Sequence, residues 1–348
     1  MPVIWLIDAY RAGERGQVRA LADALGWPCE TKTLRYRKHV VLPHVLGRTT
    51  LRGIDAGSAA SLQAPWPDLV ISSGVRNEPV CRWIREQSGG RARYVHVGRP
   101  WASLESFDLV ITTPQYRVPE ESNVVNNTLT LHSVTPERLA QARREWAPIF
   151  EALPRPRIAV IAGGDSGPFT FGAGAAARLG REASQLAMVQ EGSLMVSTSS
   201  RTRPAAVAAL KDHIRGPHYF YPWTSGDLAN PYMGILGWAD RLIVTADSIA
   251  MLSEACATGK PVRMFDLGGM RAEPDGNRRD FRLGGVLYGF MMRWLWKPLS
   301  RDITRVHARL RGSGGATWSD ELLGTARRPA QTDMQHAVDA VRHLLDQV

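Results

Sequence analysis

The chain has 348 residues, of which 44% are apolar and 22% are charged, the composition of a globular protein with room for two domains. Its three cysteines, Cys29, Cys81 and Cys256, are scattered, which excludes a disulfide framework or a zinc site by spacing and fits a reducing cytoplasm. A formal net charge of +10 favours anionic partners, namely a nucleotide, a phospholipid surface or nucleic acid, without choosing among them.

The chain opens with an apolar strand, Val3–Ile7, followed by a loop over Asp8–Gln17 and by helical periodicity up to Gly26. Asp8 interrupts the apolar run, which is not typical of a signal peptide. A strand, a glycine-containing loop and a helix in this order present backbone N–H groups to a ligand. The loop has no GxxxxGK[ST] pattern and is therefore not a Walker loop.

Strands and helices then alternate through the first half. The next expected strands are Glu30–Leu34, Asp68–Ser72, Tyr94–Val97 and Leu109–Thr112, and the expected helices are Val80–Glu86 and Pro136–Phe150. This alternation predicts a parallel sheet covered by helices on both faces. Between the second and third strands, the run from Arg35 to Arg52 mixes cations with valine and leucine. It fits either a solvated face over a packed helix or a surface for an anionic or lipid-linked partner.

Two prolines within Leu153–Arg157 stiffen a short connector, and we place the domain boundary there. The predicted organisation is an N-terminal domain over 1–152, a C-terminal domain over 157–330, and a C-terminal helix over 331–348 that packs back on the first domain. In the second domain a strand, Ile158–Ile161, runs into a glycine-rich loop, Ala162–Phe169, and an alanine-rich helix. The remaining expected strands are Leu194–Thr198, Tyr219–Tyr221, Leu242–Thr245 and Val262–Phe265.

The stretch from Ala239 to Val262 predicts a buried strand, a turn at 246–248 and a helix that a glycine ends. In an α/β domain the N-terminus of such a helix faces the crevice at the carboxyl ends of the strands, where anions bind. Asp247 or Ser248 can cap the helix, and Glu254, about one and a half turns in, can offer a carboxylate to sugar hydroxyls. The alternative is an ordinary βαβ unit whose cap only caps.

Two motifs resemble sites of unrelated enzymes. Gly164–Gly167 matches the tetrapeptide around the nucleophile of chymotrypsin-type proteases, but that fold is all-β, whereas this serine lies between a strand and a helix. The GxSxG of α/β-hydrolases is absent. Gly172, Gly174 and Ala177 form a loose GxGxxA too far past the strand to indicate a dinucleotide site. No Asp-x-Asp occurs in the sequence, so nothing indicates a metal held by paired carboxylates.

Several segments together resemble one protein family. They are Gly163–Pro168, Ser197–Thr202, Asn230–Tyr232, Val244–Ser248 and Ser253–Val262, with Val95–Pro100 and Phe107–Pro114 in the first half. These motifs resemble the mitochondrial-fission Elm family, whose bacterial members are regarded as glycosyltransferases. The likeness runs from about Ile4 to Val262 and is more specific in the second half. It implies a GT-B-like α/β fold: two Rossmann-like doubly wound domains facing across a cleft, the C-terminal one holding a nucleotide-sugar.

The implied reaction is glycosyl transfer from a nucleoside-diphosphate sugar to a hydroxyl, without a metal or a cofactor. Arg201 and the backbone N–H groups of 164–167 would stabilise charge on the diphosphate, Glu254 would bind the ribose, and the loop from Tyr221 to Tyr232 would flank the base. The expected donor-site residues are Gly163, Gly164, Asp165, Ser166, Gly167, Ser200, Arg201, Thr202, Tyr221, Asn230, Asp247, Ser248, Met251 and Glu254.

The expected acceptor-side loop contains Gly13, Glu14 and Gln17. The family's first loop usually reads Gly-His, with a Gln three residues after the His, and here Glu14 stands where that His is expected. We predict that Glu14 is the general base, although Arg11 and Arg15 nearby would lower the pKa of its carboxyl group. The alternative is a solvated carboxylate paired with arginine.

The natural acceptor in bacteria would be a lipid-linked saccharide such as a lipopolysaccharide core, so we expect a cytoplasmic protein in peripheral contact with the anionic inner membrane surface. Leu283–Leu299 combines methionine and tryptophan with Arg293 and Lys297, which is typical of an interfacial segment or, alternatively, of a segment packed in the core. Its uncharged run, Val286–Met292, is too short to span a bilayer. The alternative function is a non-catalytic adaptor that binds membrane or a partner protein. We expect no nucleic-acid partner, because no recognition motif occurs.

Overall fold

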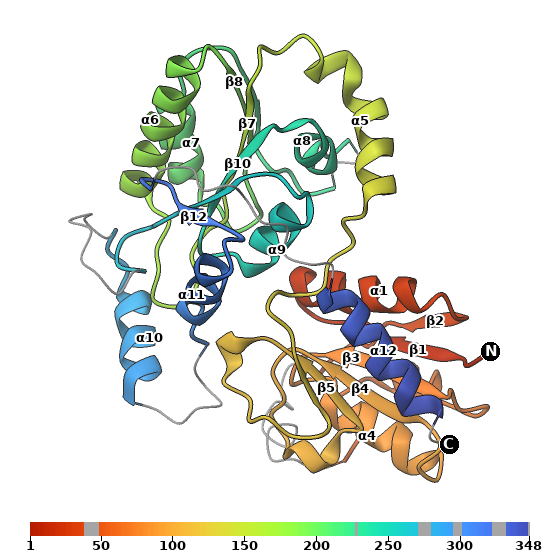
Figure 1. Ribbon diagram of the computed structural model, residues 1–348. Coiled ribbons are helices and arrows are strands. Elements are labelled where there is room, and N and C mark those ends of the chain that lie inside the picture. Colours follow the sequence, from red (N-terminus) through yellow and green to blue (C-terminus); the bar gives the residue numbers. More distant parts are fainter. Residues whose placement is uncertain (38–48, 227–228, 271–279, 295–300, 322–331, 347–348) are drawn as a thin grey trace. The chain divides into compact units, whose positions relative to one another are not determined.

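The computed structural model describes residues 1–348 apart from 38–48, 227–228, 271–279, 295–300, 322–331 and 347–348 (Figure 1). The chain forms two compact units. Unit 1 contains Met1–Ser133 and Gln331–Val348, and unit 2 contains Val134–Ala330. Each unit has its own parallel sheet with helices, so the predicted pair of Rossmann-like α/β domains is confirmed.

Unit 1 is built on a six-stranded parallel sheet. In spatial order its strands are β2 (Cys29–Lys32), β1 (Ile4–Ile7), β3 (Leu69–Ser73), β4 (Arg93–Val97), β5 (Leu109–Thr112) and β6 (Val124–Asn126). Its described helices are α1 (Ala12–Leu25), α3 (Ala56–Ala60), α4 (Glu78–Gln87) and α12 (Thr332–Asp346), with short 3-10 turns η1 (Leu104–Ser106) and η2 (Pro114–Tyr116). The strand order changes direction between β1 and β3.

Alternation along β1 divides the core of unit 1 into two layers. Ile4 and Leu6 belong to the apolar layer that includes residues of α1 and α12, such as Leu21 and Val341. Trp5 and Ile7 belong to the other layer, which includes residues of α4. A strand buried on both faces needs apolar residues at every position, which explains the unbroken run that the sequence shows.

Unit 2 also has a six-stranded parallel sheet. Its strands in spatial order are β12 (Thr317–Trp318), β11 (Val262–Phe265), β10 (Arg241–Thr245), β7 (Arg157–Ile161), β8 (Ser193–Ser197) and β9 (His218–Tyr221). Its described helices are α5 (Pro136–Phe150), α6 (Ala173–Val189), α7 (Pro204–His213), α8 (Tyr232–Trp238), α9 (Ile249–Ala257), α10 (Leu283–Trp294) and α11 (Thr304–Gly312). Counted from β7, this is the 3-2-1-4-5-6 order of a Rossmann sheet, whose direction reverses between β7 and β10.

The boundary between the units lies before α5, whereas the sequence placed it at 153–157. Helix α5 packs on α8: the Trp238 indole donates to the Arg143 carbonyl over 2.9 Å, and a Cβ at Gly234 would lie 2.5 Å from the Trp146 ring. The connector itself is tied to unit 2, because the Arg157 guanidinium donates to the carbonyls of Glu151 and Leu153. Proline content alone does not show which side of a connector packs on which sheet.

The expected strands lie within a residue or two of the observed ones, except β6 and β12, which the sequence analysis missed because they are only three and two residues long. The loop expected over Asp8–Gln17 is wrong in its second half, since α1 begins at Ala12. The Arg15 amide already donates to the Arg11 carbonyl, so Gly13 and Gly16 are helical. Most of the basic run between Arg35 and Arg52, residues 38–48, lies outside the described residues.

Candidate functional site

The candidate site lies where β7 and β10 part, at the carboxyl ends of the central strands of unit 2. Open parallel sheets bind ligands at such a reversal of strand order. The backbone N–H of Gly163 donates to the Thr245 hydroxyl over 2.7 Å, and that of Gly164 donates to the Asp247 carboxylate over 3.0 Å. The loops after β7 and β10 are therefore tied to each other.

Glycine is required at both positions, because neighbouring atoms leave no room for a Cβ. A Cβ at Gly163 would lie 2.4 Å from Asp247 Oδ2, and a Cβ at Gly164 would lie 2.2 Å from the backbone oxygen of Arg201. The hydroxyls of Ser199 and Thr202 both donate to the Gly163 carbonyl. Three loops thus interlock here, one after each of β7, β8 and β10, and no side chain fits between them.

Asp247 is the buried centre of this arrangement. Its carboxylate is fully buried, and its Oδ2 lies 3.0 Å from Nη2 of Arg201, which is 40% exposed. The same guanidinium donates to the Asp165 carbonyl over 3.2 Å. Asp247 Oδ1 has no hydrogen-bond partner among the described residues, so it can accept one more donor.

The N-terminus of α9 follows directly. Ser248 is its N-cap residue, but the serine side chain makes no capping hydrogen bond, and Asp247 bonds to Gly164 and Arg201 instead. The capping role expected for these two side chains is therefore wrong. The first N–H groups of α9 keep the partial positive charge of an uncapped helix start, which suits an anion.

Arginines surround the loop from Gly163 to Thr170. Besides Arg201, these are Arg203, which pairs with Asp165, Arg282, whose Nε lies 3.8 Å from Asp165 Oδ2, and Arg301, which donates to the Ser166 hydroxyl. The sequence analysis did not select Arg203, Arg282 or Arg301. Arg203 lies one residue beyond a recognised segment, whereas Arg282 and Arg301 come from either side of α10, where no local pattern indicated them.

The backbone amides expected to bind phosphate differ in whether they already donate a hydrogen bond within the protein. The amide of Gly164 donates to Asp247 and that of Ser166 to the Phe169 carbonyl over 3.0 Å, so neither is open to a ligand. Within the described part of the chain, the amides of Asp165 and Gly167 have no such partner. Gly167 has φ +57°, a left-handed conformation that favours glycine. The Asp165 side chain accepts from the Phe171 amide over 3.0 Å, which makes it a brace of the loop.

Glu254 and Tyr232 form a second polar element, on α9 and α8. The Tyr232 hydroxyl donates to Glu254 Oε2 over 2.6 Å. Burial raises the pKa of the Glu254 carboxyl above its usual range, against the opposing effect of this hydrogen bond. The pair can present both an acceptor and a hydroxyl to a polyol. Asn230 accepts from the Tyr232 amide over 3.0 Å and so braces the start of α8.

The remaining expected donor residues lie at the carboxyl ends of the same strands or on α9. Tyr221 ends β9 and is buried, Ser200 is exposed after β8, and Met251 is partly buried in the first turn of α9. Thr202 accepts from the Ser199 amide over 2.9 Å, which shapes the turn that carries Arg201.

His307 of α11 holds the turn before Asp247 in place. The sequence analysis missed it. Its Nε2 donates to the Ala246 carbonyl over 2.7 Å, because a carbonyl can only accept. Burial lowers the pKa of His307 to about 4, so the ring is neutral near pH 7. His307 thereby fixes the turn that carries Asp247.

In unit 1 the residues expected on the acceptor side lie on α1 and not in a loop. Glu14 Oε1 is 3.6 Å from Nη1 of Arg11, and Arg15 turns away to Asp8 over 2.9 Å. Only one of the two arginines therefore pairs with Glu14. A Cβ at Gly74, after β3, would lie 3.1 Å from Glu14 Oε2, so Glu14 extends towards the carboxyl end of β3.

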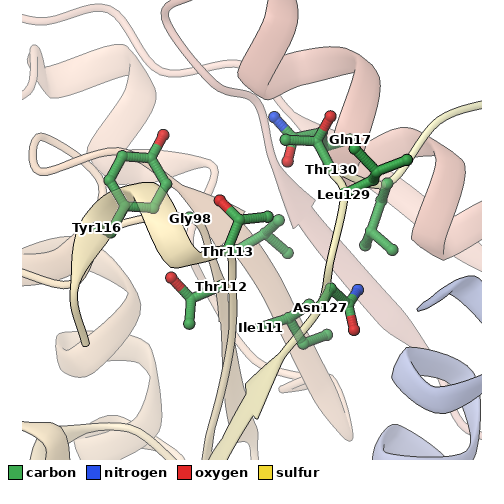
Figure 2. Close-up of a pocket in the computed structure, with 11 residues that line it drawn as sticks. Gln17, Gly98, Ile111, Thr112, Thr113, Tyr116, Asn127, Leu129 and Thr130 are labelled. Carbon is green, nitrogen blue, oxygen red and sulfur yellow. The ribbon is translucent and has the colours of Figure 1, made fainter. Parts of the chain in front are cut away.

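A small depression opens at the carboxyl ends of β4 and β5 (Figure 2). Gln17 of α1 contributes to its rim, and the residues around it carry no charge. The lining side chains able to form hydrogen bonds are those of Gln17, Thr112, Thr113, Tyr116, Asn127 and Thr130. Uncharged hydroxyl and amide groups suit a neutral polyol better than a phosphate.

The recognised segment Val95–Pro100 has a structural explanation. The buried Glu78 carboxylate accepts from the amides of Trp101 and Ala102, each over 3.0 Å, and His96 Nε2 bonds to the Arg99 carbonyl over 3.1 Å. Burial raises the pKa of Glu78 to about 7 and lowers that of His96 to about 4. These two side chains hold the loop after β4 in place.

The described residues offer neither a metal-binding cluster nor a membrane-spanning helix. They hold no cluster of three or more histidine, cysteine, aspartate or glutamate side chains that could bind a metal ion. None of the helices in the described ranges is long and apolar enough to cross a membrane.

The chain thus has two Rossmann-like α/β domains, the second with a glycine-rich loop after its first strand, which is the fold class expected from the sequence. The sequence model of the family described as Mitochondrial fission ELM1 matches residues 12–331, and the chain belongs to this family. It is 27% identical over 300 residues to the mitochondrial fission protein ELM1 of Arabidopsis thaliana, covering 77% of this chain and 69% of that protein. It is 24% identical over 302 residues to the uncharacterized protein RP120 of Rickettsia prowazekii (strain Madrid E), covering 75% of this chain and 82% of that protein.

Solved structures show distant likenesses over the whole chain. A co-structure of S. aureus MnaA with UDP has a TM-score of 0.49 and 11% identity, covering 100% of this chain and 98% of that one. The E. coli ADP-heptose lps heptosyltransferase II has a TM-score of 0.46 and 11% identity, covering 100% and 99%.

Proposed function

We propose that the chain is a metal-independent glycosyltransferase that takes a nucleoside-diphosphate sugar as donor and transfers the sugar to a hydroxyl of a saccharide. The observation that supports this most directly is that Arg201 and the uncapped start of α9 meet at the strand reversal of unit 2. Arginine and helix N-termini both suit a diphosphate. The Glu254 and Tyr232 pair suits the ribose hydroxyls.

In the proposed reaction the acceptor oxygen bonds to the anomeric carbon of the sugar, and the bond from that carbon to the β-phosphate oxygen breaks. The nucleoside diphosphate leaves with the added negative charge, which Arg201 and the amides of Asp165 and Gly167 would stabilise. The acceptor proton must go to a base. Glu14 is our proposed base, and the donor phosphate is the alternative in a retaining mechanism.

The acceptor is proposed to be a lipid-linked saccharide of the lipopolysaccharide type, reached by a cytoplasmic protein at the inner membrane. The support is indirect and comes from the net charge of +10, which favours an anionic surface.

A second candidate function is a non-catalytic adaptor with the same fold. The observation that favours it is that the groups proposed to bind phosphate already have partners within the protein. Asp247 accepts from the Gly164 amide and pairs with Arg201, and Asp165 pairs with Arg203. The Arabidopsis relative is named for mitochondrial fission, and an adaptor would share that kind of role.

A thermal-shift screen against nucleoside diphosphates and their sugars tests the proposal. A ligand at 100 times its Kd stabilises the folded state by about 2.7 kcal/mol, which raises the unfolding temperature. Arg201→Met should remove most of that rise, whereas Arg181→Met, at an exposed arginine of α6, should keep it. If no nucleotide raises the unfolding temperature of the parent, the adaptor takes precedence.

A further inference from the structure

Helix α10 has two unlike faces. Its inner face lies on the glycine-rich loop of the candidate site. A Cβ at Gly285 would lie 3.0 Å from the Pro168 carbonyl oxygen, and a Cβ at Gly167 would lie 2.9 Å from the Tyr288 ring. Just before the helix, Arg282 donates to the Gly167 carbonyl and, over 3.3 Å, to the Thr170 hydroxyl. Small residues and one arginine thus seat α10 closely on the loop.

The outer face of α10 is apolar and exposed. Leu283, Val286, Leu287 and Phe290 follow the i, i+3, i+4, i+7 spacing of one helical stripe, and Phe281 precedes them. Their exposed fractions are 75%, 60%, 61%, 58% and 80%, respectively. Single exposed apolar side chains are common, but a continuous helical stripe normally lies against another apolar phase.

Cations dominate the sequence around this stripe. Residues 281–311 contain seven cations against one carboxylate, Asp302. Arg282 and Arg301 contact the glycine-rich loop, and Arg305 and Arg311 pair with Asp302 and Glu321. The other three cations are Arg293, Lys297 and Arg309. Arg309 is exposed on α11, the next helix along the chain (Figure 1). Residues 295–300 of the expected interfacial segment lie outside the described residues. An apolar stripe amid cations is the composition of a helix that lies in a lipid interface.

We propose that the outer face of α10 binds the surface of an anionic phospholipid bilayer. At 12 residues the helix is about 18 Å long, well short of the roughly 30 Å hydrocarbon core, so it would lie in the plane of the interface. The charge argues against a second copy as occupant, since two chains of +10 repel each other. Because the inner face of α10 seats on the loop from Gly163 to Thr170, the bilayer would hold that loop at the membrane surface. The inference depends on α10 and not on the proposed reaction.

Flotation of the purified full-length chain with vesicles tests the proposal. The vesicles are phosphatidylcholine alone or phosphatidylcholine with about one third phosphatidylglycerol. The decisive variant is Leu287→Glu with Phe290→Glu, on the outer face. Its matched control is Met188→Glu with Val189→Glu, at two exposed apolar residues of unit 2 that are 55% and 78% exposed at the end of α6. Circular dichroism and thermal unfolding establish that all proteins are folded.

The parent and the α6 control should float with the anionic vesicles at low salt and much less with the neutral ones. The α10 variant should lose at least about tenfold in partition coefficient. Raising the salt from about 0.05 M to 0.5 M should weaken binding by the parent, because it shortens the Debye length. A parent that does not float, or an α10 variant that floats like the parent, overturns the proposal. Concentration-dependent dimerisation that only the α10 variant abolishes would also overturn it, in favour of a second copy as occupant.

Discussion

Glu254 is the residue that we propose to bind the ribose of the donor. It lies on the helix whose start faces the candidate anion site, and its carboxylate meets the Tyr232 hydroxyl. We expect Glu254→Gln to weaken nucleoside-diphosphate binding by about 1 to 3 kcal/mol, the range for losing a hydrogen bond to a charged group. Isothermal titration calorimetry measures the change. Glu182→Gln is the control, because burial raises the pKa of Glu182 as well, while its partners are Arg178 and Ser319. Equal affinities for Glu254→Gln and the parent would remove Glu254 from the donor site.

His307 should make unit 2 sensitive to acid. The pKa of its ring is about 4 when folded and about 6.5 when unfolded, so between these values the unfolded chain binds a proton that the folded chain does not. The stability that depends on His307 being neutral is therefore fully present above pH 6.5. It falls, by about 3 kcal/mol in all, as the pH drops to 4. His307→Gln can still donate to Ala246 but does not titrate. Urea unfolding of both proteins at several pH values should show a smaller loss for the variant, and parallel pH profiles would contradict the prediction.

Glu14 is the general base that we propose in the first unit. Glu14 lies 3.6 Å from Arg11, whereas Arg15 pairs with Asp8. With an identified donor and acceptor, Glu14→Gln should lower kcat by about 10²-fold or more and leave donor affinity unchanged. Glu121→Gln, at an exposed carboxylate of the same unit, should behave like the parent. Turnover near the parental value in Glu14→Gln would assign the proton to another acceptor.

At the scale of loops and helices, the glycines differ in whether a side chain could replace their hydrogen atom. Gly164 has the backbone oxygen of Arg201 where a Cβ would lie, whereas Gly16 in α1 has nothing within 4 Å. Gly164→Ala should destabilise unit 2 by about 1 to 3 kcal/mol, because the interlocked loops must move apart. Gly16→Ala should stabilise unit 1 by about 0.5 to 1 kcal/mol through helix propensity. Thermal unfolding measures both, and a stabilised Gly164→Ala would contradict the described packing.

The elements that the sequence predicted are those with strong local signals. Fully buried strands such as β7 and β10 are unbroken apolar runs, and helix α9 has a glycine at its end. The start of α1 was missed, because glycine and charged residues resemble a loop when tertiary contacts are unknown. At the candidate site, Gly163, Gly164 and Asp247 could be predicted because they lie in the segments that resemble the family. Arg282 and Arg301 could not be predicted, because they reach the glycine-rich loop only through the packing of α10 on it.

At the scale of the whole molecule, the two units use different strand orders for the same kind of sheet. In unit 1 the order reverses between β1 and β3, after one crossover, and in unit 2 it reverses between β7 and β10, after two. The sequence predicts two alternating domains but not these orders, because spatial order depends on which side of the sheet each crossover takes. The domain boundary was misplaced for another reason, namely that proline content does not show that α5 packs on α8 of unit 2.

Helix α12 completes unit 1 from a distant part of the chain. Ala337, Val338 and Val341 are buried in the same layer as Leu21 of α1, and the Asp333 carboxylate accepts from the Leu129 amide over 2.8 Å. Val341→Lys would bury an unpaired charge and should destabilise unit 1 by about 3 kcal/mol or more. His336→Lys, exposed on the same helix, is the control. Hydrogen exchange should show lost protection in β1, β3 and α1 with protection in unit 2 retained, and unchanged exchange in Val341→Lys would contradict the packing of α12.

The position of α12 at the end of the chain affects the order in which the two units can fold. Residues 134–330 separate α12 from the rest of unit 1, so the ribosome releases the whole of unit 2 before it releases α12. Until then the apolar layer between the first sheet and α1, which includes Val18 and Leu21 of α1, lacks the part of its cover that α12 supplies, while unit 2 already has all of its strands. Unit 2 can therefore fold during synthesis, and unit 1 must wait with an apolar layer exposed. A nascent chain of this protein should depend on chaperones for its first unit and not for its second.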